Sequence, residues 1–118
     1  MILVDTSVWI AHLKQRTGHA ELIAALEGGV VTTHPFVEGE LLLAGAPVAE
    51  LLAGVTMLPV APHEEVRALA ASWQGALPGI GWVDTHLLYS ALVHQQRLLT
   101  LDTRLEGHFR RLGGRAWS

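Results

Sequence analysis

The stretch ILVDTSVWIAHL, residues 2–13, decides the fold class because a short apolar run stands directly before a helix-initiating cluster. Three consecutive aliphatic residues, 2–4, are typical of a strand that is buried on both faces of a parallel sheet. Asp5-Thr6-Ser7 then offers N-cap side chains, and apolar residues follow at helical density. The stretch therefore predicts a buried strand that leads straight into a helix.

The remaining chain continues this alternation of short strands and helices between turn residues such as Gly28-Gly29, Pro47 and Gly54. The expected strands cover residues 30–33, 55–60, 98–101 and, at the end of the chain, 116–117. The expected helices cover residues 21–26, 35–44, 47–54, 64–74, 84–96 and 105–112. This order predicts a single α/β domain over residues 1–118 with a mainly parallel sheet.

The composition excludes several classes of protein. Of the 118 residues, 50% are hydrophobic and 16% are charged, and there is no cysteine. We therefore expect a globular domain without disulfides or thiolate chemistry, as is typical of a cytoplasmic protein. The N-terminus lacks the basic region of a signal peptide, and Gly45, Pro47 and Gly54 interrupt the apolar run 41–61, so no membrane segment is expected.

Charge is distributed unevenly along the chain. Residues 1–65 carry two basic and eight acidic side chains, whereas residues 66–118 carry six arginines and three acids. The net charge of −3 lacks the basic excess of proteins that bind nucleic acid chiefly through its phosphates. On this evidence alone, the C-terminal arginines are expected on solvated helix faces.

An apolar residue followed by Asp-Thr occurs three times, at Asp5, Asp84 and Asp102, each where a helix is expected to begin. Taken singly, each aspartate is explained as an N-cap. In a parallel α/β sheet, however, the carboxyl ends of the strands share one edge, where ligands bind. Three carboxylates at that edge repel one another unless a hard divalent cation binds them.

The stretch THPFVEGELLLAG, residues 33–45, sets two glutamates inside an apolar run. On a helix, Glu38 and Glu40 point in different directions, so they are not expected to serve one site together. Periodicity does not decide between them, and either one is equally explained as a solvated carboxylate at the edge of an amphipathic helix.

Four motifs, DTSVW, HPFVEGELLLAG, GWVDTHLL and LLTLDTRL, together resemble the PIN domain, and specifically the VapC-type toxins of toxin–antitoxin pairs. The resemblance extends from Ile2 to about Leu105. It implies a three-layer α/β/α sandwich around a mainly parallel sheet. It also implies a metal-dependent endoribonuclease, in which a water activated by bound Mg²⁺ or Mn²⁺ attacks an RNA phosphodiester bond.

The resemblance assigns the acidic residues by position. It implies that Asp5, Glu40, Asp84 and Asp102 are catalytic and bind the metal, with Glu40 chosen because it stands in the Gly-Glu-Leu of the motif. Glu38 departs from the pattern, since such sequences tend to have an aliphatic residue there, and it is expected to face solvent or a partner. The expected supporting residues are Thr6, Ser7, Thr100 and Thr103.

The resemblance also implies partners. RNA is the expected substrate, with weaker expectations of phosphate contacts from Arg104, Arg110 and Arg111. A VapB-like antitoxin protein is expected to block the site, commonly with a basic side chain that meets the carboxylates. A homodimer is expected too. The residues that either form its interface or pack in the core are Leu41 to Leu43, Val48, Leu51 and Leu52.

The seven histidines show no tight pair of metal ligands at helical spacing and are expected to be structural or surface residues. Trp9 is expected on an apolar helix face, and Trp82 is expected to staple the helix that Asp84 opens. Two alternative classes remain. One is a PIN fold kept as a binding module with little catalysis. The other is a phosphorelay receiver, which would require adjacent acids after the first strand and a lysine after the last, whereas Lys14 is the only lysine.

Overall fold

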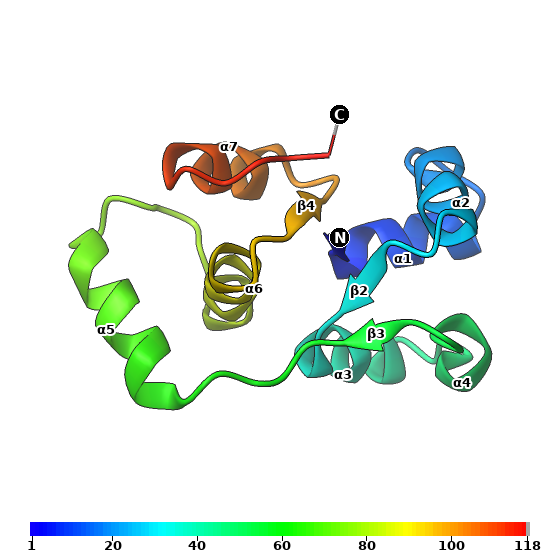
Figure 1. The fold of residues 1–118 in the computed structure, drawn as a ribbon, viewed down its shortest axis with the longest axis horizontal. Helices are drawn as coiled ribbons and strands as arrows, with labels where there is room; N and C mark the ends of the chain where they lie inside the picture. The colour runs from blue at the N-terminus through cyan, green and yellow to red at the C-terminus, as the bar shows by residue number, and fades with distance from the viewer. Residues whose placement is uncertain (118) are drawn as a thin grey trace.

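A fully parallel four-stranded sheet in the order β3-β2-β1-β4 organises the computed structural model, which describes residues 1–117 (Figure 1). The strands are β1 (Ile2–Val4), β2 (Val31–Thr33), β3 (Thr56–Met57) and β4 (Arg97–Leu99). The helices are α1 (Thr6–Leu13), α2 (His19–Glu27), α3 (Pro35–Leu43), α4 (Val48–Leu51), α5 (His63–Trp73), α6 (Trp82–Val93) and α7 (Thr103–Arg111). The predicted α/β class with a parallel sheet is confirmed.

The first strand lies in the middle of the sheet. Ile2 pairs with Val31 of β2 on one side and with Arg97 of β4 on the other. A strand with neighbours on both sides and helices on both faces needs apolar side chains throughout, which explains why residues 2–4 show no alternation. Because β1, β2 and β4 are parallel, the residues that follow them lie at one edge of the sheet.

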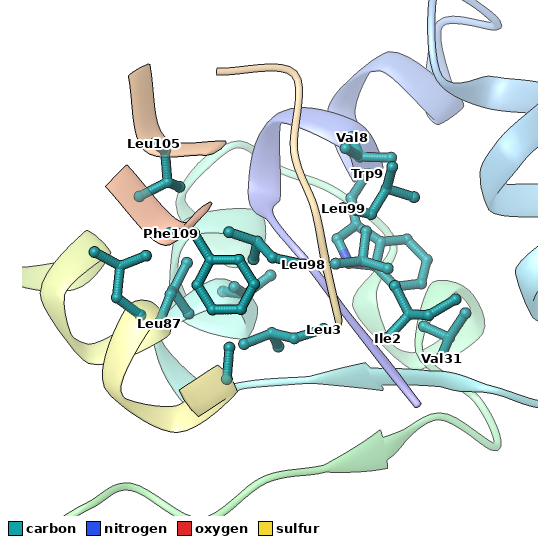
Figure 2. Packing of buried hydrophobic residues seen from close by; sticks show 14 of the residues in the cluster. Ile2, Leu3, Val8, Trp9, Val31, Leu87, Leu98, Leu99, Leu105 and Phe109 are labelled. Carbon is teal, nitrogen blue, oxygen red and sulfur yellow. The ribbon is translucent and has the colours of Figure 1, made fainter. Parts of the chain in front are cut away.

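Helices on both sides of the sheet complete a three-layer α/β/α arrangement (Figure 1). Figure 2 shows Phe109 of α7 beside Leu98 and Leu87, while Trp9 of α1 lies with Leu99 in another part of the core. Both aromatic side chains are completely buried, and burial of a side chain such as Phe109 contributes about 1.5–3 kcal/mol. The prediction that Trp9 packs in the core is confirmed.

The start of α6 differs from the prediction. The helix begins at Trp82, with Gly81 as its N-cap, so Asp84 lies inside the first turn and is not an N-cap. Trp82 is therefore the first residue of the helix and not a staple in front of it. A carboxylate in the first turn is still favourable, because it faces the positive end of the helix dipole. The predictions that Asp5 and Asp102 are N-caps are confirmed.

The predicted strands are shorter in the structure. The strand expected over residues 55–60 is reduced to Thr56–Met57 at the sheet edge, and Pro59, which has no N–H to donate, follows soon after. At the C-terminus, only one isolated bridge joins Ala116 to Leu98 within residues 1–117. β4 ends at Leu99, because the next side chain turns toward Asp5.

The apolar run of α3 is buried on one side only. Leu41 is fully buried, whereas Leu42 and Leu43 are 59% and 91% exposed, and Glu40 is exposed as well. Val48, Leu51 and Leu52 are partly buried against the core. Of the two explanations for these residues, packing in the core therefore holds for Leu41 but not for Leu42 and Leu43, because a helix against one face of a sheet buries only one stripe of its residues.

Length excludes a membrane-spanning helix from the described part of the chain. The longest helix, α6, has 12 residues, and no helix of residues 1–117 is long and apolar enough to cross a bilayer.

Candidate metal-binding active site

Asp5 is held by three hydrogen bonds at the carboxyl end of the central strand. Its Oδ1 accepts from the Thr6 backbone N–H at 2.8 Å. Its Oδ2 accepts from Ser7 Oγ at 3.0 Å and from Thr100 Oγ1 at 2.7 Å. The residue is only 8% exposed, and these donors satisfy a carboxylate that would otherwise be costly to bury. Asp5 therefore has a fixed orientation.

The same two hydroxyls tie the segment after β4 to Asp5. Thr100 Oγ1 accepts from the backbone N–H of Asp102 at 3.0 Å. Ser7 Oγ accepts from the backbone N–H of Leu101 at 3.2 Å. Each hydroxyl thus donates to the Asp5 carboxylate and accepts from the chain that follows β4. This network sets the position of a second carboxylate, that of Asp102, relative to the first.

Asp102 uses one carboxylate oxygen to cap α7. Its Oδ1 accepts from the backbone N–H groups of Arg104 and Leu105 at 2.9 and 3.2 Å. No hydrogen bond to Oδ2 is made within the described residues, and the side chain is exposed, so Oδ2 is accessible to a ligand. The Thr103 hydroxyl, expected as a supporting group, makes no hydrogen bond to an acid in the same part of the chain.

Glu40 reaches the site from α3. Its Oε1 accepts from Thr6 Oγ1 at 2.7 Å, which places it beside the residue that follows Asp5. Glu38 has no such contact within residues 1–117 and is half-buried on another side of the helix. Of the two glutamates in the apolar run, Glu40 is therefore the one that the fold brings to the other acids.

The pKa of Asp84 shows that the other three carboxylates lie close enough to act on it. Burial raises the pKa of Asp84, and the negative charge of Asp5 raises it further, followed by those of Asp102 and Glu40. A hydrogen bond from the Gly81 backbone N–H has the opposite effect on this pKa, because it stabilises the charged form. Asp5 at the end of β1, Glu40 of α3 and Asp102 at the start of α7 thus act with their negative charges on Asp84 of α6.

No basic side chain neutralises these acids in the described structure. The two ion pairs within residues 1–117, Arg67 with Glu64 and Arg110 with Glu106, both lie on single helices and involve none of the four. Hard carboxylate oxygens that repel one another are the donor set that Mg²⁺, Mn²⁺ and Ca²⁺ prefer. The residues therefore fit a divalent cation.

The carboxylates are not yet gathered around a single point. Among residues 1–117, no three acidic or histidine side chains stand close enough to hold one ion. Asp5 is fixed by its donors, whereas Glu40 has one hydrogen bond and Asp84 one from backbone.

The three arginines expected to contact RNA differ in their surroundings. Arg104 lies over Gly79, so closely that a Cβ on that glycine would overlap the guanidinium group. Gly79 has φ +80°, which also favours glycine. Arg110 is paired with Glu106 at 3.7 Å, and Arg111 is exposed. Arg104 is the arginine nearest in sequence to an acid of the site, two residues after Asp102.

Two pairs of histidines lie together that the spacing along the chain did not indicate. His12 and His19 face each other with Nδ1 atoms 2.9 Å apart, joining α1 to α2. His34 caps α3, since its Nδ1 accepts from the Phe36 N–H at 3.0 Å, and its ring lies 6.1 Å from that of His86. Such contacts depend on tertiary structure, and spacing along the chain carries no signal of them.

A comparison with known families settles the classification of this fold and site. The PIN domain matches residues 2–113. The chain belongs to the PIN-domain family. This PIN domain is 43% identical over 111 residues to Ribonuclease VapC32 of Mycobacterium tuberculosis, a match that covers 90% of this chain and 88% of the relative. The predicted resemblance to VapC-type PIN domains is confirmed.

Solved structures share the fold of this PIN domain. FitAcB from Neisseria gonorrhoeae has a TM-score of 0.70 at 20% identity, covering 100% of this chain and 97% of the other. FitAB bound to an IR36 DNA fragment has a TM-score of 0.68 at 22% identity, covering 99% and 94%. PAE2754 from Pyrobaculum aerophilum has a TM-score of 0.56 at 16% identity, covering 95% and 88%. The predicted PIN-like α/β/α fold is therefore confirmed.

Proposed function

We propose that this PIN domain is a divalent-metal-dependent endoribonuclease and the toxin of a VapBC-type toxin–antitoxin pair. The observation that carries the proposal is that the charges of Asp5, Asp102 and Glu40 raise the pKa of Asp84, while no ion pair within residues 1–117 involves any of the four. The 43% identity to a ribonuclease over most of both chains supports the choice of RNA as substrate. A binding module without chemistry has no need to maintain such repulsion.

Asp5, Glu40, Asp84 and Asp102 would hold one or two ions of Mg²⁺ or Mn²⁺. A bound divalent ion at such a site lowers the pKa of a water and neutralises charge on the phosphate that is attacked. Asp5 is the rigid member of the set, because three donors fix it. Glu40 is exposed and makes one hydrogen bond, so it is suited to orient the attacking water.

The protein's own acids exclude RNA until a cation is present, because an anionic phosphate is repelled by four carboxylates. Arg104 then supplies a positive charge beside the site. Its guanidinium is held over Gly79 and has no ion pair within residues 1–117, so its donors are free for a phosphate oxygen. Arg111 is the second choice, and Arg110 is partly neutralised by Glu106.

The charge of the site indicates an antitoxin partner, and the exposed apolar side chains of α3 indicate a second copy of this chain. A VapB-like antitoxin would inhibit the enzyme by placing a basic side chain among the carboxylates, where it replaces the cation. Leu42 and Leu43 are the apolar side chains of α3 that the core does not use, and we assign them to the homodimer interface. Leu41 is excluded from that role because it is buried inside the protomer.

Cleavage of a folded, tRNA-like RNA by the purified, antitoxin-free protein tests the proposal. The reaction is run with Mg²⁺, with Mn²⁺ and with EDTA, for the wild type and for Asp5→Asn. We expect cleavage with either metal and none with EDTA or with the variant. Cleavage that persists in EDTA would contradict the mechanism. A folded wild type that binds divalent ions but cuts no RNA would favour the binding module.

A further inference from the structure

Trp82 is a large aromatic residue left open to solvent next to the acidic site. It is the first residue of α6, two positions before Asp84, and it is 43% exposed. Trp9 is completely buried, and Trp73 and Trp117 are partly buried against the core. An indole that served only the core would be covered in the same way, since its burial would stabilise the protein.

Other rings hold the indole in place. The His63 ring from the start of α5 lies 5.5 Å from it, between centroids, at 50°. The His86 ring lies 5.1 Å away at 86°, and His86 itself is buried. His86 in turn packs at 4.7 Å against Phe36 of α3. The orientation of Trp82 is thus set by a chain of rings that crosses from α5 through α6 to α3.

One acid of the site lies near the start of α6. Val83, the residue after Trp82, lines an apolar groove of about 470 Å³ together with Phe36 and Glu40. Trp82 and Asp84 are separated by about 3 Å along the axis of α6, but residues two apart point to different sides of a helix. A single nucleotide cannot occupy both, so a group on the indole belongs to a neighbouring nucleotide.

We propose that Trp82, braced by His63, is a stacking platform for an unpaired base that neighbours the scissile phosphate of the RNA. The inference rests on the proposed ribonuclease function and deepens it by naming a substrate feature. An indole face recognises any base but requires that base to be out of a duplex. Single strands, loops and bulges therefore meet the requirement, and a continuous duplex does not.

The test measures binding apart from cleavage. Protein with Mg²⁺ is titrated, by anisotropy, against a fluorescent oligoadenylate of eight nucleotides whose linkages cannot be cut. The same titration is made with this oligomer carrying one abasic position and with an eight-base-pair duplex of the same uncleavable kind. The variants are Trp82→Ala, Trp82→Phe, and Val93→Ala as control, since Val93 is an exposed apolar residue on the last turn of the same helix. Thermal melting verifies that each is folded.

We expect Trp82→Ala to bind the single strand about 10- to 100-fold more weakly, as is usual for the loss of one base-stacking residue. Trp82→Phe should retain most of the affinity and Val93→Ala all of it. The abasic strand should bind the wild type more weakly than the intact strand, and this difference should vanish in Trp82→Ala. The dependence of affinity on salt should not change, because no phosphate contact is removed.

Equal single-strand affinity of the wild type and Trp82→Ala would overturn the platform, and would favour a protein partner as the group that covers the indole. Equal affinity of the wild type for the intact and abasic strands would also overturn it, even if Trp82→Ala failed to fold. A wild type that shows the abasic effect but never cleaves RNA with Mg²⁺ or Mn²⁺ would instead contradict the proposed function and leave the platform supported. The two failures are therefore distinguishable.

Discussion

Thr6 Oγ1 donates a 2.7 Å hydrogen bond to Glu40 Oε1, and it is the contact that joins α3 to the acids at the end of β1. Thr6 also follows Asp5 directly, and its backbone N–H is one of the three donors to that carboxylate. One residue thus positions two acids that are 35 positions apart in the sequence. The choice between the two glutamates of α3 depends on this contact.

Exchange of each glutamate for glutamine tests that choice. Glu40→Gln should reduce RNA cleavage by about 10- to 100-fold, the usual effect of a lost ligand-orienting group. Glu38→Gln is the matched control and should leave cleavage unchanged, because its side chain touches none of the other acids. The measurement is the single-turnover rate in Mg²⁺. Equal losses in both variants would show that the Thr6 contact does not identify the functional residue.

Asp84→Asn should make the metal-free protein more stable while it abolishes cleavage. The pKa of Asp84 is raised, so the folded state binds a proton more readily than the unfolded state does, and the ionised form destabilises the fold. This destabilisation is present above the raised pKa and disappears as pH falls through it. Thermal melting in EDTA at pH 7 should show a higher Tm for the variant, by about 4 °C for each kcal/mol removed.

The same melting experiment with added Mg²⁺ or Mn²⁺ supplies the control for Asp84. A ligand at 100 times its Kd stabilises the state that binds it by about 2.7 kcal/mol. The Tm of the wild type should therefore rise with metal and that of Asp84→Asn should rise less. If Asp84→Asn has a lower Tm than the wild type in EDTA, then the ionised Asp84 carboxylate does not destabilise the fold as proposed.

Arg104→Ala should weaken RNA binding and reduce the salt dependence. Loss of one phosphate contact lowers the slope of log K against log salt by about 1. Arg110→Ala should have a smaller effect, because its guanidinium is already paired with Glu106 at 3.7 Å. Affinity measured at several salt concentrations, for a strand that cannot be cut, separates the two. If the slope of log K against log salt is unchanged in Arg104→Ala, then Arg104 does not contact an RNA phosphate.

Leu43→Lys should convert a dimer to monomers without loss of stability of the protomer. The side chain is 91% exposed and contributes almost nothing to the core. The contrasting variant is Leu41→Ala, which removes a fully buried side chain and should cost about 2–5 kcal/mol in unfolding free energy. Mass measurement by light scattering, together with urea unfolding, separates the two effects. A Leu43→Lys protein that remains a dimer places the interface elsewhere.

Acid should destabilise the protein through His34. Burial, with the charge of His86 as a second cause, lowers the pKa of His34 to about 4. The unfolded imidazole takes up its proton near pH 6.5, so the free energy of unfolding falls as pH drops from about 6.5 to 4. His34→Asn still caps α3, since asparagine is a preferred N-cap, and should flatten this decline. Urea unfolding at pH 4.5 and 7 measures the free energy of unfolding of the wild type and of His34→Asn. An equal decrease between these pH values in both proteins would contradict the role of His34.

Much of the sheet edge could be predicted, because strand ends and helix caps are local signals. The apolar residues 2–4 followed by Asp5 predict both a buried strand and a capped helix, and the structure has both. The same holds for Asp102 at the start of α7. In a parallel sheet these ends must meet, so the approach of Thr100 to Asp5 follows from topology.

Other features depend on contacts that a linear pattern does not contain. Asp84 resembles an N-cap because Thr85 follows it, yet the helix begins two residues earlier, at Trp82. The exposure of Leu42 and Leu43 follows from the side of α3 that faces the sheet, and hydrophobicity alone gives no hint of it. The pair of His12 and His19 arises because α2 folds back on α1.

The position of β1 between β2 and β4 has a consequence for how the protein is made. Thr100, the partner of Asp5, leaves the ribosome 95 residues after it. At about 5–20 residues per second, roughly 5–20 s pass before these residues can meet. A nascent chain that ends before Asp102 therefore lacks the assembled cluster of acids, and we expect it to cut no RNA.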